Sequence, residues 1–272
     1  MILLLGAMGY IGTAFQKEIS RRGLDYRWLS RSKIHPCDYT KEAVIRPLLK
    51  ELNPHLVINC AAFIPQPSVD LCKNDVGQTL NANVVFPLML SRVCQEHGIP
   101  LAHISTACLY GDKREYNEED QPTRDFNGYC GLYLRTKFIA EQEVGRNPMA
   151  YIWRIRLPFD EFNSPRNYLT KLRSYPEVWD HTNSLTHRGD FVKAALDMVE
   201  MNAPYGVYNM VNPGSIAAKE ICKMMWSDMK QPAFVPGPCT GSTLSTAKLL
   251  ATGVKIRNVH EAVKNALENW KP

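Results

Sequence analysis

Tyr133 and Lys137 form a Y-x-x-x-K pattern whose residue types and spacing suit acid–base chemistry. On a helix, residues four apart share one face, so the phenol and the ammonium can converge on one point. A neighbouring cation favours the phenolate, which eases proton donation from the tyrosine to a carbonyl that is being reduced. Lys137 can also hold the ribose of a nicotinamide cofactor. Tyr129 competes for the role, but its fourth follower is Tyr133 and not a lysine.

Hydroxyl-bearing residues stand at the end of the apolar run 101–105, ahead of this pair. A hydroxyl at the end of that predicted strand would hydrogen-bond the substrate carbonyl beside the tyrosine. By position we assign this role to Thr106, with Ser105 as the second choice. We therefore predict that Thr106, Tyr133 and Lys137 are the catalytic residues of a carbonyl reductase.

Three glycines near the start of the chain form a G-x-x-G-x-x-G pattern between a predicted strand and a predicted helix. They permit a tight turn and a close approach of the backbone to a pyrophosphate. The helix that follows presents its free N–H groups and the positive end of its dipole to the phosphates. This context favours a dinucleotide site over a purely conformational turn. The loop residues predicted to contact the cofactor are Gly6, Met8, Gly9, Tyr10, Ile11 and Gly12.

The segment after the second predicted strand, residues 29–33, contains no acid. Sites for NAD usually place an Asp or Glu there, which bonds the ribose 2′-hydroxyl. Arg31, helped by Ser30, Ser32 or Lys33, would instead meet a 2′-phosphate. The alternative is that Arg31 and Lys33 are solvated loop charges. We predict NADP (as NADPH) to be the cofactor.

Further cofactor contacts are predicted beyond the glycine loop. Asp38 is a candidate contact for the adenine. Cys60, Ala61 and Ala62 follow the third predicted strand, and their small side chains let the backbone approach the cofactor.

The predicted catalytic and cofactor-binding residues can meet only in a fold that brings the ends of several strands together. Strands are predicted at residues 2–5, 26–29, 55–59, 101–105 and 150–156, and helices at 11–22, 41–52, 80–97 and 132–144. This alternation predicts an α/β fold, a Rossmann-type doubly wound parallel sheet. Beyond residue 158, Pro, Asn and Ser become frequent, and helices are predicted at 166–174, 190–201, 217–230 and 260–270. We predict a dinucleotide-binding domain with the catalytic pair over residues 1–158. A smaller, mainly substrate-binding lobe follows over residues 159–272, interleaved with the last strands of the sheet.

The amino-acid composition limits the kinds of molecule that the protein is expected to bind. The 272 residues carry a net charge of +5, with Lys and Arg scattered. This balance suits an anionic small molecule, and no basic tract with interleaved aromatics predicts nucleic-acid binding. The eight cysteines include no C-x-x-C pair and no zinc-finger spacing, so we expect reduced thiols and no metal. The apolar run 2–5 is too short for a signal segment or a membrane span, so we expect a soluble, cytoplasmic protein without membrane partners.

Together these segments resemble the extended short-chain dehydrogenase/reductases that act on nucleotide sugars. Four stretches, at residues 154–158, 163–171, 183–186 and 208–214, resemble more narrowly the nucleotide-rhamnose synthase/epimerase-reductases and the dTDP-4-dehydrorhamnose reductases. The resemblance implies a nucleotide-linked 4-keto-6-deoxyhexose as substrate. It is epimerised at C3 and C5 and then reduced at C4 by NADPH, giving nucleotide-L-rhamnose or a related deoxysugar.

Two alternatives accompany this interpretation. One is a monofunctional 4-ketoreductase that is fed by a separate epimerase. The other is a non-catalytic, NADP-binding regulatory subunit, against which the intact Tyr133–Lys137 pair argues. The resemblance also allows a homodimer.

The resemblance implies an acid and a base for epimerisation. The matching positions are Cys108, in Thr-Ala-Cys, and Lys171, in Leu-Thr-Lys. A ketone at C4 acidifies the hydrogens on C3 and C5, and inversion needs removal of a proton from one face and its return to the other. A thiol and an ammonium with pKa values moved toward neutrality can do this. The alternatives are a small core cysteine and an ordinary surface lysine.

Substrate contacts are implied at Arg166, Asn167 and Asn183, because a guanidinium grips phosphate in a bidentate way and an amide can bond the sugar or diphosphate. Asn83 matches a family asparagine that supports the active-site backbone. Two positions depart from the family pattern: Gln66 replaces an arginine and Ser245 replaces an acid. Both belong to the region expected to recognise substrate, so the sequence leaves the nucleotide and the sugar open.

Overall fold

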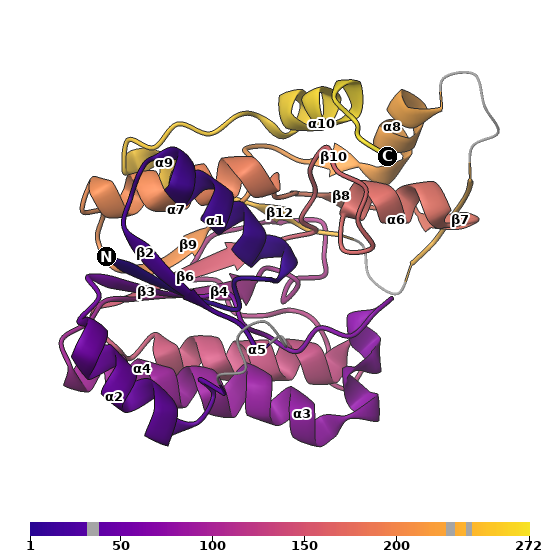
Figure 1. Ribbon diagram of the computed structural model, residues 1–272. Coiled ribbons are helices and arrows are strands. Elements are labelled where there is room, and N and C mark those ends of the chain that lie inside the picture. Colours follow the sequence, from indigo (N-terminus) through magenta and orange to yellow (C-terminus); the bar gives the residue numbers. More distant parts are fainter. Residues whose placement is uncertain (32–37, 227–231, 238–240) are drawn as a thin grey trace. The chain divides into compact units, whose positions relative to one another are not determined.

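The computed structural model describes residues 1–31, 38–226, 232–237 and 241–272. Its centre is a six-stranded sheet in the order β2-β1-β3-β4-β6-β9 (Figure 1). β1 pairs in parallel with β2 and β3, and β3 pairs in parallel with β4. The predicted α/β fold with a Rossmann-type parallel sheet is confirmed. The strands are β1 (Ile2–Leu5), β2 (Tyr26–Leu29), β3 (Leu56–Asn59), β4 (Leu101–Thr106), β6 (Ala150–Ile155) and β9 (Gly206–Asn209).

Helices lie on both faces of the strands in the first 153 residues (Figure 1). Their bounds agree with the predicted helices to within a residue or two, with one exception. The predicted helix 80–97 begins earlier, because the Asp75 side chain accepts a hydrogen bond from the Gln78 N–H and caps a short helix. A π-helical segment, Asn81–Val85, then joins this helix to the next. The helices are α1 (Tyr10–Arg21), α2 (Glu42–Leu52), α3 (Val76–Leu80), α4 (Phe86–Glu96) and α5 (Gly131–Val144).

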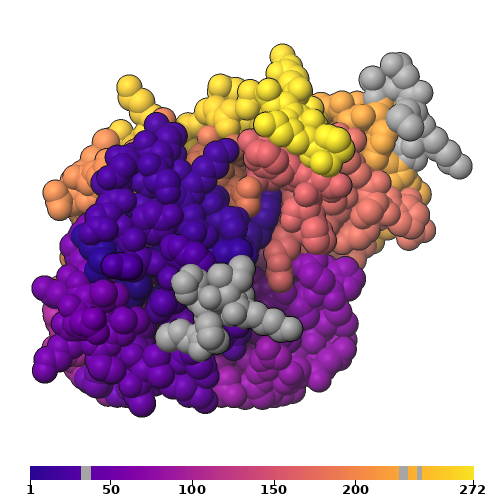
Figure 2. Space-filling model, in the orientation of Figure 1, coloured from indigo at the N-terminus to yellow at the C-terminus, as the bar shows by residue number. Residues whose placement is uncertain are grey.

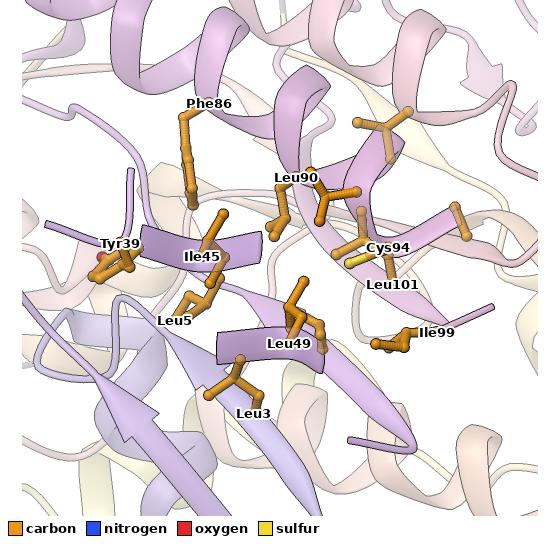
Figure 3. Packing of buried hydrophobic residues seen from close by; sticks show 14 of the residues in the cluster. Leu3, Leu5, Tyr39, Ile45, Leu49, Phe86, Leu90, Cys94, Ile99 and Leu101 are labelled. Atoms are coloured by element: carbon orange, nitrogen blue, oxygen red, sulfur yellow. The ribbon is translucent and has the colours of Figure 1, made fainter. Parts of the chain in front are cut away.

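Side chains that alternate along the strands build two apolar layers. Leu3 and Leu5 of β1 pack with Leu49 of α2 and Leu90 of α4 in one buried cluster (Figure 3). On the other face Phe15 of α1 stacks on Trp153 of β6, with ring centroids 6.0 Å apart. Burying one leucine side chain contributes about 2 kcal/mol, so these layers hold the strand ends firmly in place.

The chain divides into two compact units that interleave in sequence. The first comprises Met1–Ser105, Cys130–Trp153 and Pro204–Val207, and the second comprises Thr106–Tyr129, Arg154–Ala203 and Tyr208–Pro272. The chain passes from the first unit to the second three times, near the carboxyl ends of β4, β6 and β9. A single boundary at residue 158 therefore does not separate the two units. The chain crosses repeatedly because the parallel strands all end at the same edge of the sheet.

The second unit contains further helices and small sheets. Its helices are α6 (Tyr168–Ser174), α7 (Arg188–Glu200), α8 (Ala218–Met225), α9 (Ala247–Ala251) and α10 (Val259–Glu268). Three two-stranded sheets pair β8 (Thr182–Asn183) with β10 (Ile216–Ala217), β7 (Glu177–Trp179) with β11 (Ala233–Val235), and β5 (Glu115–Tyr116) with β12 (Thr243–Leu244).

Two predicted helices of this unit have different ends in the structure. α6 begins at Tyr168 and not at residue 166, because Asn167 caps it by accepting the Leu169 N–H. α8 ends at Met225, and part of the predicted span 217–230 lies outside the described residues.

α10 lies at the surface (Figure 2). It is amphipathic, because its buried residues recur at helical spacing. Val259 and Val263 are buried in an apolar cluster of this unit together with Phe159, Leu169 and Ile221. Within the described parts of the chain, no helix combines the length and apolarity that a membrane crossing requires.

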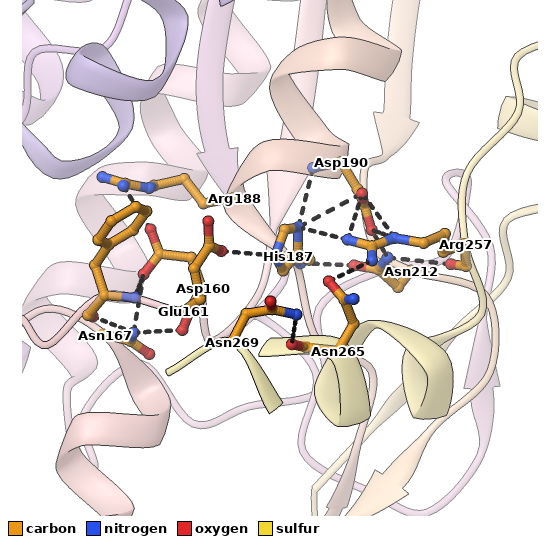
Figure 4. A network of polar contacts seen from close by, with 11 residues as sticks. Asp160, Glu161, Asn167, His187, Arg188, Asp190, Asn212, Arg257, Asn265 and Asn269 are labelled. Atoms are coloured by element: carbon orange, nitrogen blue, oxygen red, sulfur yellow. Dashed lines mark hydrogen bonds and ion pairs between the residues drawn. The ribbon is translucent and has the colours of Figure 1, made fainter. Parts of the chain in front are cut away.

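A partly buried polar network also holds the second unit together (Figure 4). Asp190 accepts hydrogen bonds from Arg257 Nη2 at 2.9 Å and from Asn212 Nδ2 at 2.8 Å. His187 lies 3.5 Å from both Asp190 and Glu161. Burial acts to raise the pKa of Asp190, but the hydrogen bonds from His187 and Arg257 outweigh it and hold that pKa at about 2.

Candidate active site

The glycine loop connects β1 directly to α1. Gly6 has φ +71°, and a Cβ there would lie 2.6 Å from Ala61 N. A Cβ on Gly12 would lie 2.4 Å from Gly6 O. No side chain caps α1, whose first turn has no acid. The loop is therefore a tight backbone turn that places the positive end of the α1 dipole where an anion can bind.

The other predicted loop contacts surround this turn. Met8 is 47% exposed at the tip of the loop, and Tyr10 and Ile11 are half-buried in the first turn of α1. Cys60, Ala61 and Ala62 follow β3, and Cys60 N donates to Leu5 O at 3.0 Å. Burial raises the pKa of the Cys60 thiol, so this cysteine stays a neutral small residue against the loop.

The end of β2 lies beside the glycine loop, because Ala7 N donates to Leu29 O at 3.2 Å. Arg31, two residues further along, is exposed. Asp38 is exposed as well, and its Oδ1 accepts a hydrogen bond from Thr40 N at 3.3 Å at the start of the turn into α2. Ser32 and Lys33 lie outside the described residues.

Tyr133 and Lys137 lie on the buried face of α5, as their spacing predicts. Tyr133 is 8% exposed and Lys137 is 3% exposed. Lys137 Nζ donates to Ile104 O at 2.6 Å and lies 3.3 Å from His103 Nε2. Burial lowers the pKa of Lys137 to about 8, and the charge of Glu141 opposes this shift.

The start of α5 is fixed by an unusual turn. Cys130 has φ +62°, in the left-handed region that favours glycine, and its N–H donates to Asp70 Oδ1 at 3.0 Å. The Asp70 carboxylate thus lies at the positive end of the helix that carries Tyr133. This contact fixes where the helix begins and so where the tyrosine is placed.

The two candidate hydroxyls at the end of β4 differ in their partners. Ser105 Oγ donates to Glu141 Oε2 at 2.6 Å, and both residues are buried. Thr106 Oγ1 accepts a hydrogen bond from Cys108 N at 3.1 Å and keeps its own hydrogen to donate. Thr106 therefore fits the predicted role better than Ser105.

In the second unit, Arg156 and Asn183 hold the Thr106–Cys108 segment. Arg156 Nη1 donates to Ala107 O at 2.9 Å, and Arg156 Nη2 donates to Asn183 Oδ1 at 2.5 Å. Asn183 Oδ1 also accepts from Ser242 N at 3.1 Å. Arg156 was not a sequence-predicted site residue, although it lies in the stretch 154–158. Asn183 is buried, so the structure gives its carbonyl a positioning role where a substrate contact was predicted.

α6 and the two residues before it carry three further candidates. Lys171 and Arg166 are half-buried, and burial lowers the pKa of both, with the Arg166 charge lowering that of Lys171 further. Asn167 is fully buried, and its amide donates to Asp160 O and Phe162 O at 2.8 and 2.7 Å. The predicted substrate contact of Asn167 is therefore corrected to helix capping, because its hydrogen-bonding groups are used inside the protein.

Three other predicted positions have clear surroundings. Cys108 is a half-buried free thiol. Asn83 bonds the backbone of Phe63 on both sides, with Oδ1 accepting at 2.7 Å and Nδ2 donating at 3.1 Å, which is the supporting arrangement expected of it. Ser245 Oγ accepts from Ala247 N at 3.4 Å at the start of α9. No group of three or more His, Cys, Asp or Glu side chains suited to a metal ion occurs among the described residues.

Comparison with known proteins identifies the family of this chain. Residues 1–271 match the family model described as RmlD substrate binding domain, so the chain belongs to this family. The resemblance to extended short-chain dehydrogenase/reductases of nucleotide-sugar and rhamnose metabolism is thereby confirmed.

Two relatives from Arabidopsis thaliana are similar in sequence. One is a trifunctional UDP-glucose 4,6-dehydratase/UDP-4-keto-6-deoxy-D-glucose 3,5-epimerase/UDP-4-keto-L-rhamnose-reductase, 29% identical over 85% of this chain and 34% of its own length. The other is a bifunctional dTDP-4-dehydrorhamnose 3,5-epimerase/dTDP-4-dehydrorhamnose reductase, 28% identical over 85% of this chain and 76% of its own length. This chain thus spans about a third of the trifunctional relative.

Among solved structures, the L780 UDP-rhamnose synthase of Acanthamoeba polyphaga mimivirus has a TM-score of 0.85 and 19% identity, over 98% of both chains. A dTDP-4-dehydrorhamnose reductase from Bacillus anthracis in complex with NADP has a TM-score of 0.82 and 20% identity, over 99% of both chains. At this identity the structures establish a shared fold.

Proposed function

We propose that this protein reduces a nucleotide-linked 4-keto-6-deoxyhexose at C4 with NADPH, after epimerising it at C3 and C5, to give nucleotide-L-rhamnose or a related deoxysugar. The observation that carries the proposal is the buried Lys137 on the same helical face as Tyr133, in the unit that contains the glycine loop. Membership of the RmlD family supports the sugar substrate.

The cofactor would be held by the glycine loop. Gly6 and Gly12 leave no room for a Cβ, and the uncapped start of α1 offers N–H groups to a pyrophosphate. Arg31 supplies a cation near the end of β2, where a 2′-phosphate would distinguish NADP from NAD. When bound, NADPH supplies the hydride for C4.

The chain's own residues manage the proton of the reduction. Tyr133 donates its phenolic proton to the carbonyl oxygen as negative charge develops there, and Thr106 donates a hydrogen bond to the same oxygen. The Lys137 ammonium stabilises the resulting phenolate. Positioned groups of this kind accelerate proton transfer about 10² to 10⁴-fold, which makes Tyr133 the residue whose loss should be most costly.

Epimerisation would use Cys108 and Lys171. The lowered pKa of Lys171, caused by burial and then by Arg166, favours an amine that can accept a proton. Cys108 is held by Arg156 through the neighbouring Ala107 carbonyl, so a thiol at a fixed place can return a proton to the other face of the ring. Arg166 is proposed to bind the diphosphate.

Product analysis by NMR tests this proposal. UDP- and dTDP-4-keto-6-deoxyglucose are each incubated with the protein and NADPH, and a 6-deoxy sugar reduced at C4 is expected from one of them. A parallel incubation in deuterated water without NADPH is expected to place deuterium at C3 and C5. Reduction without this exchange would leave the monofunctional 4-ketoreductase, and NADPH binding without turnover would leave the regulatory subunit.

A further inference from the structure

Strand β4 places a histidine, His103, between the apolar residues Ala102 and Ile104, and this ring lies beside Lys137. His103 is 1% exposed. Its Nε2 lies 3.3 Å from Lys137 Nζ, and its Nδ1 lies 3.2 Å from Asn59 Nδ2. Asn59 is itself fully buried at the end of β3. These three side chains form a cluster, Asn59–His103–Lys137, that lies wholly within the first unit.

The orientation of the Asn59 amide follows from its backbone contact. Ala61 N–H donates to Asn59 Oδ1 at 3.0 Å, so the NH₂ group must face His103. An NH₂ group only donates, and His103 Nδ1 must therefore accept. A neutral imidazole has one donor and one acceptor, which places its proton on Nε2. Burial, and then the charge of Lys137, lower the pKa of His103 well below its usual value, so the ring is neutral near pH 7.

The Nε2–H of His103 points at Lys137. An ammonium has only donors, so the charged form of Lys137 faces a second donor at 3.3 Å, whereas the neutral amine can accept from it. Lys137 keeps one acceptor, Ile104 O at 2.6 Å, in either form. The cluster therefore favours release of a proton from Lys137.

Other charged groups around α5 either oppose this effect or are neutralised. The Glu141 carboxylate, one turn further along α5, favours the ammonium, and Ser105 Oγ donates to it at 2.6 Å. Asp70 and Lys73, on the segment packed against the start of α5, pair with each other at 2.5 Å. Arg92 and Glu96 of α4 pair at 3.0 Å.

We propose that His103, oriented by Asn59, is a positioning residue that weakens the hold of Lys137 on its proton, so that Lys137 reprotonates Tyr133 after each reduction. The inference rests on the proposed function. In the reduction, the Tyr133 O–H bond breaks and its proton goes to the substrate oxygen. A Lys137 N–H bond then breaks and the phenol O–H re-forms. The resulting amine accepts a hydrogen bond from His103 Nε2–H and takes up a proton from water.

The cluster also lies next to the glycine loop. The Asn59 side chain fixes the turn at Ala61, whose backbone N is the atom that a Cβ on Gly6 would meet. The Asn59 amide thus fixes both the backbone turn that packs against Gly6 and the tautomer of His103. Neither His103 nor Asn59 touches the reacting atoms in this account.

The first test needs no variant. ¹⁵N NMR of the His103 ring in the intact protein is expected to show a proton on Nε2 and a bare Nδ1 at pH 7. The opposite tautomer, or a doubly protonated ring, would overturn the proposal. Because this measurement needs no sugar, a failure here is distinct from a failure of the proposed reductase activity.

The second test compares His103→Asn with the wild type. Asparagine keeps an acceptor at the Nδ1 position for Asn59 and removes the donor that faces Lys137. We expect the NMR titration midpoint of Lys137 to rise by about one pH unit, and the alkaline limit of kcat to move with it. His55→Asn, at an exposed histidine that bonds the chain's amino group, is the matched control and should leave both values unchanged. An unchanged Lys137 midpoint in a folded His103→Asn protein would refute the role assigned to His103.

Discussion

Lys137 in the first unit and Lys171 in the second are both lysines whose pKa is lowered by burial, but their surroundings differ. Lys137 is almost fully buried, and its ammonium is held by a main-chain carbonyl and faces a histidine. Lys171 is half-buried beside a second cation, Arg166. A buried lysine with fixed partners suits the proposed C4 reduction, in which the same proton transfer recurs at one position. A more exposed lysine suits the proposed epimerisation, in which protons are exchanged at both C3 and C5 of the sugar ring.

The largest effect should come from exchanging each lysine for methionine. Lys137→Met removes the cation beside Tyr133, and we expect reduction to fall about 10³-fold in initial-rate measurements of NADPH oxidation. Lys171→Met should abolish deuterium uptake at C3 and C5 while lowering reduction of an already epimerised substrate about tenfold or less. Equal losses of both activities in both variants would remove the distinction between the two lysines.

The two units should also differ in how their stability depends on pH. Leu49→Ala opens a cavity in the apolar layer of the first unit and is expected to cost about 3 kcal/mol of unfolding free energy at any pH. Asp190→Asn leaves Arg257 without its carboxylate in the second unit and should cost about 3 kcal/mol near pH 7.

The pH dependence of Asp190 has a definite sign. Its folded pKa, about 2, lies below the usual 3.8, so its stabilising contribution is present above pH 3.8 and is lost as the pH falls through about 2. Urea unfolding at several pH values measures this. The cost of Asp190→Asn should shrink toward pH 2 while that of Leu49→Ala stays constant, and parallel curves would contradict the account.

A smaller effect is expected at the end of β2. Arg31→Ala should raise the KM for NADPH about tenfold, the loss of one charge-assisted hydrogen bond, and leave the KM for NADH within about twofold. Arg27→Ala, at another exposed arginine of the same region, is the control and should change neither value. A clear preference of the wild type for NADH would contradict the NADP assignment.

The smallest effect concerns the pH profile of the reduction. Because the pKa of Lys137 is about 8, the ammonium is lost as the pH rises through that value. We expect kcat to fall about twofold between pH 7 and pH 8 when the chemical step limits the rate. Lys171 should not cause this alkaline fall in kcat, so Lys171→Met should show the same midpoint as the wild type. A shifted midpoint in Lys171→Met would show that Lys171, and not Lys137, causes the fall.

Local patterns predicted the first unit well. β1 and the first three residues of β3 are short apolar runs, and the Y-x-x-x-K spacing placed Tyr133 and Lys137 on one buried helical face. Ends set by capping side chains were harder, since Asp75 and Asn167 each change where a helix begins. Their side chains look like ordinary loop residues until the backbone is folded around them.

Long-range partners could not be predicted in this way. His103 lies 34 residues before Lys137, and Ala107 lies 49 residues before Arg156. No local periodicity connects such pairs, because the fold alone brings them together. A signal did exist for His103, because a histidine between two apolar residues of a buried strand needs buried hydrogen-bond partners.

The central claim is hydride transfer to a nucleotide-linked 4-keto sugar with Tyr133 as proton donor. The most direct measurement uses NADPH deuterated at the hydride position, with UDP- or dTDP-4-keto-6-deoxyglucose as substrate and NMR detection of the product. The account predicts deuterium at C4 with the wild type, and almost none with Tyr133→Phe, whose folding and NADPH affinity should be unchanged. Bound NADPH with no label at C4 in the wild type, or equal labelling by Tyr133→Phe, would contradict it.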